Sequence, residues 1–142
     1  MSILDIGKLG PSDNLQIPFA DGGVRAGFPS MAQDTVDRCL DLNSLVMSHP
    51  STTFCARVKG DSMIGAGVHD GDILVIDRSL EPRDGDMAVC FVDGEFTLKF
   101  IEIADDCLWL RPANPDYPKI KVTEDNDFVV WGVVTYTIYK RR

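Results

Sequence analysis

Histidine and paired cysteines, the residues that most often mark metal and triad chemistry, are scarce in this chain. Of its 142 residues only two are histidines, His49 and His69, and the four cysteines include no Cys-x-x-Cys pair. The cysteines are Cys39, Cys55, Cys90 and Cys107. The pattern predicts reduced, buried thiols and no structural zinc site, and neither histidine is placed by the sequence to complete a Ser-His-Asp triad.

Positive charge is also in short supply. Lys and Arg number 14 against 22 Asp and Glu, which gives a net charge of −8, and the pI is about 4.6. Binding to nucleic-acid phosphates requires clustered Lys and Arg, and the basic cluster here is Lys140-Arg141-Arg142 at the C-terminal end. We therefore expect no direct specific binding of DNA, and a solvated C-terminal tail.

Long hydrophobic runs are missing as well. No stretch approaches the roughly 18 consecutive apolar residues of a membrane span, and the first residues lack the basic segment and apolar run of a secretory signal. These absences predict a cytoplasmic protein that does not contact a membrane. The sequence also contains no P-loop and no Gly-x-Gly-x-x-Gly, and the acidic loop Val68–Asp72 lacks the ligand spacing of an EF-hand.

What the chain does contain changes in character at about residue 30. The first 30 residues hold five of the 12 glycines and three of the 8 prolines, and they show neither helical nor strand periodicity. We therefore expect an extended N-terminal arm there. A chain of 142 residues is long enough for one compact domain with its own core.

After the arm, the sequence predicts one short helix and then strands. The helix is expected at 41–48, with Asp41 or Asn43 as its N-cap. The predicted strands, rich in β-branched and aromatic residues, are 54–58, 73–76, 87–92, 96–103, 108–110 and 128–139. Between the third and the fourth lies Asp93-Gly94, a pair that a type I′ hairpin turn prefers. The predicted fold class is a mainly antiparallel β domain.

Lys99 lies inside one of these strands, among apolar residues. Strand alternation places Leu98 and Phe100 on one face, and Thr97, Lys99 and Ile101 on the other. A buried ammonium must be paired or its pKa must fall from about 10.4, and a lysine with a pKa near 7 is a usable general base. The alternative is an edge-strand lysine whose stem follows the sheet and whose ammonium reaches water, and the pattern by itself favours this second interpretation.

Ser62 lies at a break that follows a predicted strand, in Gly60–Ile64. Backbone N–H groups exposed at such a break can form an oxyanion hole. The segment is not the Gly-x-Ser-x-Gly nucleophile elbow, because Ile64 occupies the place of the second glycine. Taken alone, a serine in a Gly-Asp-Ser turn is most often a structural turn residue.

Three segments, in this order along the chain, resemble the LexA-type self-cleaving Ser–Lys peptidases: Val58–Met63 (VKGDSM), Asp70–Asp72 (DGD) and Asp93–Lys99 (DGEFTLK). Lys99 follows Ser62 by 37 residues, a separation that fits the family. The resemblance covers nearly the whole chain, and it implies that Ser62 is the nucleophile and Lys99 the general base. It also implies the family's fold, a LexA- and signal-peptidase-like β domain with a flexible N-terminal arm.

Members of this family cut their own chain between a small residue and glycine, and Val24–Pro29 (VRAGFP) matches such a site. The implied scissile bond joins Ala26 to Gly27. Residues 1–26 would then be an arm that self-cleavage removes, and residues 27–142 the peptidase and dimerisation domain. The Gly-rich arm can bend into a cleft, where glycine allows close approach of the backbone.

The resemblance implies further features of the reaction and its partners. The backbone N–H groups of Ser62 and Asp61 would form the oxyanion hole, and no metal or cofactor is needed. Within the family, the chain looks most like the subunits that serve the error-prone polymerase V of the SOS response. The implied partners are a RecA–single-stranded DNA filament that triggers cleavage, a Y-family (UmuC-like) polymerase, and a second copy in a homodimer.

Two alternatives to this interpretation remain open at the level of sequence. One is a non-catalytic polymerase-binding subunit in which Ser62 and Lys99 are idle, and the other is a repressor-derived fragment of a mobile element. LexA and the phage repressors of the family carry an N-terminal helix-turn-helix domain. Because only 26 residues precede the proposed cut, without its helical pattern, we expect no repressor function.

Overall fold

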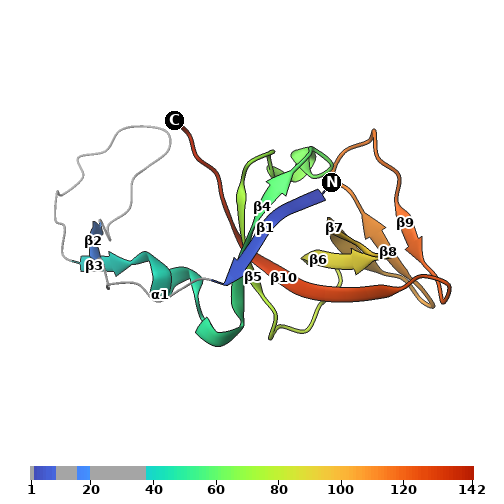
Figure 1. Ribbon diagram of the computed structural model, residues 1–142, viewed down its shortest axis with the longest axis horizontal. Helices are drawn as coiled ribbons and strands as arrows, with labels where there is room; N and C mark the ends of the chain where they lie inside the picture. The colour runs from blue at the N-terminus through green and yellow to red at the C-terminus, as the bar shows by residue number, and fades with distance from the viewer. Residues whose placement is uncertain (1, 9–15, 20–37) are drawn as a thin grey trace. The chain divides into compact units, whose positions relative to one another are not determined.

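The computed structural model describes residues 2–8, 16–19 and 38–142 (Figure 1). The chain divides into two units, one made of Met1–Leu9 with His49–Arg142 and the other of Gly10–Ser48. The larger unit contains the sheet and both residues of the predicted catalytic pair. No helix among the described residues is long and apolar enough to cross a membrane.

An eight-stranded sheet forms the larger unit, with the strand order β1-β4-β5-β10-β6-β7-β8-β9. Every neighbouring pair in it is antiparallel. The strands are β1 (Ser2–Lys8), β4 (Thr53–Lys59), β5 (Ile73–Asp77), β6 (Met87–Val92), β7 (Glu95–Ile103), β8 (Leu108–Arg111), β9 (Ile120–Val122) and β10 (Phe128–Ile138). Two short 3-10 helices accompany them, η1 (Pro50–Thr52) and η2 (Ile64–Ala66). The predicted mainly antiparallel β fold is confirmed.

Strand β10, the long red strand in Figure 1, joins the two halves of the sheet. Its first half pairs with β6 and its second half with β5, and the register shifts between Val130 and Gly132. A Cβ at Gly132 would lie 2.4 Å from Cγ2 of Ile76, so only glycine fits at this crossing. One strand therefore connects the β4–β5 side, which leads to Ser62, with the β6–β7 hairpin that carries Lys99.

The β6–β7 hairpin sets the position of Lys99. Asp93 and Gly94 both adopt positive φ, 49° and 91°, as the predicted type I′ turn requires. The Asp93 carboxylate also accepts hydrogen bonds from Asn126 Nδ2 at 2.8 Å and from the backbone N–H of Asp127 at 2.9 Å. The type I′ turn by itself sets the register of the hairpin, and Ala88 stands opposite Lys99.

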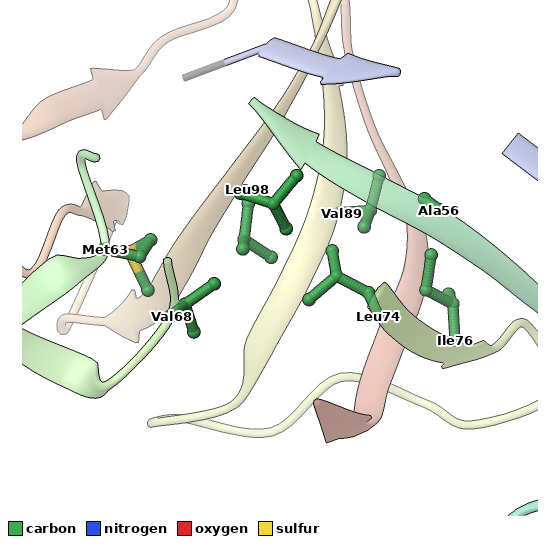
Figure 2. Packing of buried hydrophobic residues seen from close by; sticks show 8 residues of the cluster. Ala56, Met63, Val68, Leu74, Ile76, Val89 and Leu98 are labelled. Atoms are coloured by element: carbon green, nitrogen blue, oxygen red, sulfur yellow. The ribbon is translucent and has the colours of Figure 1, made fainter. Parts of the chain in front are cut away.

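Two clusters of buried side chains form the core. The larger one consists of Ala56, Val58, Met63, Val68, Leu74, Ile76, Val89 and Leu98 (Figure 2). The smaller one consists of Ala88, Cys90, Ile101 and Leu110. Strand alternation on β7 directs Leu98 into the larger cluster and Ile101 into the smaller one, as the sequence predicted.

The smaller unit contains a two-stranded sheet and one short helix. Strand β2 (Gln16–Phe19) pairs antiparallel with β3 (Arg38–Asp41), and α1 (Leu42–Val46) follows directly. Of the two N-cap candidates, Asp41 is the one used, because its Oδ1 accepts a hydrogen bond from the backbone N–H of Asn43 at 3.1 Å. The predicted helix is confirmed, although it is shorter than expected.

The N-terminal segment expected to be an extended arm includes two strands that the search for periodicity did not indicate. Residues 2–8 form β1 and pair with β4, and residues 16–19 form β2. A strand at a sheet edge joins through its backbone N–H and C=O groups, which demands no alternation of side chains, so a search for periodicity misses it. Residues 20–37, which include the predicted cleavage site at Ala26 and Gly27, lie outside the described residues.

Candidate active site

A closed loop between β4 and β5 carries Ser62. The backbone N–H of Val58 donates to Asp72 O, and that of Gly71 donates to Val58 O, each at 2.8 Å. Inside this closure Asp70 Oδ1 accepts a hydrogen bond from the Gly60 N–H at 2.7 Å. Gly60 and Gly71 have φ values of 99° and 89°, which explains the glycine at each end of the loop.

The loop and the hairpin bring Ser62 and Lys99 together. Nζ of Lys99 lies 3.5 Å from Oγ of Ser62. Ser62 is 0% exposed and Lys99 is 4% exposed, so both groups are removed from bulk water. The alternative of a solvated edge-strand lysine is therefore wrong. Strand β7 lies between β6 and β8, and the ammonium does not reach solvent.

Burial changes the acid–base behaviour of the lysine. Desolvation lowers the pKa of Lys99 below its ordinary value, and a negative charge on Cys90 would raise it. Burial also raises the pKa of the Cys90 thiol to about 12, however, so this thiol is uncharged near neutral pH. No carboxylate of the described residues forms an ion pair with Lys99. The neutral amine is thus favoured by its surroundings.

Two further acceptors orient the amine. Nζ of Lys99 donates to Oγ1 of Thr97 at 2.7 Å and to the carbonyl oxygen of Leu98 at 3.2 Å. A neutral amine has two N–H groups and one lone pair. When the two N–H groups donate hydrogen bonds to Thr97 and Leu98, the lone pair is left to accept the hydroxyl proton of Ser62. The arrangement can therefore perform general-base chemistry on a serine hydroxyl.

Thr97 is a site residue that the sequence analysis did not single out for a role. It was placed on the same strand face as Lys99, and that relation is the signal that would have found it. Residues i and i+2 of a strand are neighbours on one face, so the hydroxyl of Thr97 is the nearest polar side chain that the strand itself offers to Lys99.

The backbone around Ser62 leaves two donors free. The carbonyl oxygen of Ser62 accepts from the N–H of Ala113 at 2.8 Å, and that of Asp61 accepts from the N–H of Ile64 at 3.1 Å. The N–H groups of Asp61 and Ser62, by contrast, have no acceptor among the residues that the structure describes. These are the two groups expected to form an oxyanion hole, and they are available to receive an oxygen atom.

The histidines have other partners. Nδ1 of His49 lies 2.6 Å from Oδ2 of Asp77. The ring of His69 stacks on Tyr139 with ring centroids 4.3 Å apart, and its Nδ1 is 3.4 Å from Oδ2 of Asp72. Neither histidine contacts Ser62 or Lys99. The described residues include no group of three or more His, Cys, Asp or Glu side chains that would hold a metal ion.

Comparison with known proteins identifies the family to which this geometry belongs. Residues 18–135 match the model of the Peptidase S24-like family, a range that includes Ser62 and Lys99. This chain belongs to the Peptidase S24-like family. The chain is also 41% identical over 124 residues to protein ImpA of Salmonella typhimurium, across 87% of this chain and 83% of that protein.

Two other relatives are a second protein of similar length and a LexA repressor. Protein MucA of Escherichia coli is 41% identical over 124 residues, which cover 86% of this chain and 84% of that protein. The LexA repressor of Halorhodospira halophila is 40% identical over 113 residues, which cover 79% of this chain and 50% of the repressor. The chain is therefore a protein of the serine-peptidase kind, and its resemblance to the LexA-type peptidases is confirmed.

Proposed function

We propose that this protein is a self-cleaving serine peptidase that uses Ser62 as nucleophile and Lys99 as general base to cut its own Ala26–Gly27 bond. The observation that carries the proposal is the 3.5 Å approach of Nζ of Lys99 to Oγ of Ser62 in a water-excluded place. A lysine needs such a place to be neutral, because burial without a counter-ion lowers its pKa. A lysine with a purely structural role would be better served by a carboxylate partner.

The first half of the reaction forms an acyl-enzyme. Neutral Lys99 takes the hydroxyl proton of Ser62, and Oγ attacks the carbonyl carbon of Ala26. The carbonyl oxygen becomes an oxyanion that the backbone N–H groups of Ser62 and Asp61 stabilise. When this intermediate collapses, the C–N bond to Gly27 breaks, and the Lys99 ammonium returns the proton to the departing amine.

The second half releases the product. The ammonium has given up its proton, so Lys99 is again neutral and removes a proton from a water molecule. The resulting hydroxide attacks the ester carbon, and the bond to Oγ breaks with return of the proton to Ser62. Residues 1–26 leave with a new carboxyl terminus, and residues 27–142 begin at Gly27. Every proton in this cycle passes through the two side chains, and no metal or cofactor takes part.

We further propose that the cleavage serves the SOS response. The similarity to ImpA and MucA over more than four-fifths of each chain supports a UmuD-like role in SOS mutagenesis. In that role a RecA–single-stranded DNA filament favours the conformation in which the arm presents the Ala26–Gly27 bond to Ser62, and cleavage follows. The trimmed homodimer then joins a UmuC-like, Y-family polymerase for error-prone synthesis.

The mass of the product tests the proposal. Purified full-length protein, incubated with and without activated RecA, should yield one new species that lacks residues 1–26. Ser62→Ala should give none while it keeps the same circular dichroism spectrum, and Gly27→Glu should block the cut by placing a bulky charge at the scissile bond. A wild-type protein that stays intact under both conditions would favour the non-catalytic subunit, and cleavage by Ser62→Ala would remove Ser62 from its role.

A further inference from the structure

The geometry points to Asn114 and Tyr117 as positioning residues that hold the backbone of Asp61 and Ser62 in the orientation that the reaction needs. This inference rests on the proposed function, since it concerns how Ser62 and the two oxyanion donors are aimed. Neither residue touches the reacting atoms. They act from the segment Ala113–Tyr117, which we call the clamp loop, and which joins β8 to β9.

Asn114 forms a hydrogen bond with the peptide unit that precedes Ser62. Its Nδ2 donates a hydrogen bond to the carbonyl oxygen of Asp61 at 3.0 Å. That carbonyl and the N–H of Ser62 belong to one planar peptide unit and point in opposite directions. Fixing the direction of the Asp61 carbonyl therefore also fixes the direction of the Ser62 N–H, which is one of the two proposed oxyanion donors.

Tyr117 holds the same residue by its side chain. Its hydroxyl donates to Oδ1 of Asp61 at 2.8 Å, and the two contacts together bind Asp61 at its main chain and at its side chain. The hydrogen bond to Asp61 raises the pKa of the Tyr117 phenol above its ordinary value. The phenol consequently remains a donor at the alkaline pH where a lysine base is neutral.

The clamp loop is itself ordered and is tied to the far side of Ser62. Oδ1 of Asn114 accepts from the N–H of Asp116 at 3.0 Å, and the N–H of Tyr117 donates to Asn114 O at 3.1 Å. Ala113 donates its N–H to Ser62 O at 2.8 Å and accepts one from the N–H of Gly65 at 2.7 Å. A Cβ at Gly65 would lie 2.4 Å from Ala113 O, so the close approach requires glycine.

The two bonds of Ala113 involve backbone atoms, which leaves Asn114 and Tyr117 as the members that substitution can test. Asn114→Asp keeps the Oδ1 that orders the loop and loses the donor to Asp61 O. Tyr117→Phe removes only a hydroxyl from a side chain that is 38% exposed. Each should slow self-cleavage about tenfold. This is a smaller loss of rate than the roughly 100- to 1000-fold that follows removal of an oxyanion donor itself.

Matched substitutions elsewhere provide the controls. Asn126 also donates Nδ2 to an aspartate, Asp93, and accepts a backbone N–H with Oδ1, but in the turn between β9 and β10. Tyr139 is likewise an exposed tyrosine, with its ring on His69. Asn126→Asp and Tyr139→Phe should therefore show what the same chemical changes do to stability, with cleavage rates within about twofold of the wild type.

The experiment measures the rate constant of self-cleavage of full-length protein from pH 6 to 10, at a temperature where circular dichroism shows every variant folded. Asn114→Asp and Tyr117→Phe should both lower the rate at every pH. Tyr117→Phe should leave the midpoint of the profile unchanged, because it changes no charge near Lys99, whereas the added carboxylate of Asn114→Asp should not move the midpoint to lower pH. A merely structural role would lower the melting temperature without this loss. The double variant Asp61→Ala with Tyr117→Phe should cleave no more slowly than the slower of the two single variants, because both substitutions remove the same hydrogen bond.

The outcomes separate the two proposals. If the wild type cleaves, Ser62→Ala does not, and Asn114→Asp and Tyr117→Phe keep pace with their controls, the positioning role is wrong and the proposed function stands. If the wild type does not cleave, or Ser62→Ala does, both proposals are overturned. Should Asn114→Asp fail to fold, Tyr117→Phe decides the matter alone, because its hydroxyl lies at the surface.

Discussion

Met63 and Leu98 pack in the same fully buried cluster, and each is the chain neighbour of one member of the Ser62–Lys99 pair (Figure 2). The core therefore fixes the two backbones from which the pair projects. This relationship explains how a serine in a loop and a lysine in a hairpin, far apart in the sequence, meet with their polar atoms 3.5 Å apart. Packing of apolar residues, rather than an ion pair, sets the geometry of the site.

Leu98→Ala should weaken both stability and cleavage. Removal of this buried side chain leaves a cavity, and the free energy of unfolding should fall by about 2–5 kcal/mol. Leu110→Ala in the smaller cluster is the control, because Leu110 is equally buried but is not a neighbour of either site residue. Denaturant unfolding should show similar losses of stability for the two variants. The cleavage rate of fully folded protein should fall more for Leu98→Ala than for Leu110→Ala. Equal rates would contradict the link between this cluster and the site.

Thr97→Val should alter the pH dependence of cleavage. The substitution keeps the shape of the side chain and removes the acceptor that lies 2.7 Å from Nζ of Lys99. Loss of an acceptor destabilises the ammonium more than the amine, so the midpoint of the pH–rate profile should move to lower pH. The plateau rate should also fall, because the lone pair is less well oriented. Thr135→Val, which removes a hydroxyl that donates to Val75 O at 3.3 Å, should change neither. An unaltered profile for Thr97→Val would exclude the orienting role of Thr97.

Asp77 should make folding stability depend on acid pH. Burial by itself would raise the pKa of this carboxyl, but hydrogen bonds from Ser79, His49 and Thr52 prevail and lower it from 3.8 to about 2. A carboxyl with a depressed folded-state pKa stabilises the protein above the unfolded-state value, and the contribution is lost as pH falls through 3.8 toward 2. Its full size near neutral pH is on the order of 2 kcal/mol.

Urea unfolding of the wild type and Asp77→Asn measures this contribution. The difference in unfolding free energy between the two proteins should shrink by about half between pH 6 and pH 3. Asp70→Asn provides a comparison, since Asp70 caps the backbone of Gly60 and its carboxylate has no histidine partner. A difference for Asp77→Asn that stays constant over this range would show that the network does not favour the charged carboxylate.

Local patterns predicted the strands well and the connections between them poorly. The predicted strand at 87–92 coincides with β6, and the turn at Asp93-Gly94 adopts the expected positive φ values, because alternation and turn chemistry are local properties. Strand β9 was missed, since three residues are too few to show a period. Strand β1 was missed because its place at the sheet edge depends on backbone pairing with β4.

The candidate site shows the same division between local and non-local information. Periodicity placed Lys99 on a face of β7, but its proximity to Ser62 came from the family resemblance, because no pattern links two residues so far apart in the chain. The clamp loop was not predicted at all. Asn114 and Tyr117 meet Asp61 across more than 50 residues of sequence, and a polar residue in a Pro-rich loop carries no local sign of such a contact.

The pH dependence of spontaneous self-cleavage tests the central assignment most directly. Only neutral Lys99 can accept the proton of Ser62, so the rate constant of the full-length wild type, measured by the mass of its products between pH 6 and 10 without RecA, should rise with pH. The rate should then reach a plateau, and the midpoint of the rise should lie below the ordinary lysine pKa of about 10.4, because burial lowers the pKa of Lys99. Lys99→Arg and Lys99→Ala should not cleave at any pH, since a guanidinium stays charged and a methyl group cannot accept a proton. A flat wild-type profile, or a Lys99→Arg protein that cleaves at the wild-type rate, would contradict the assignment of Lys99 as the general base.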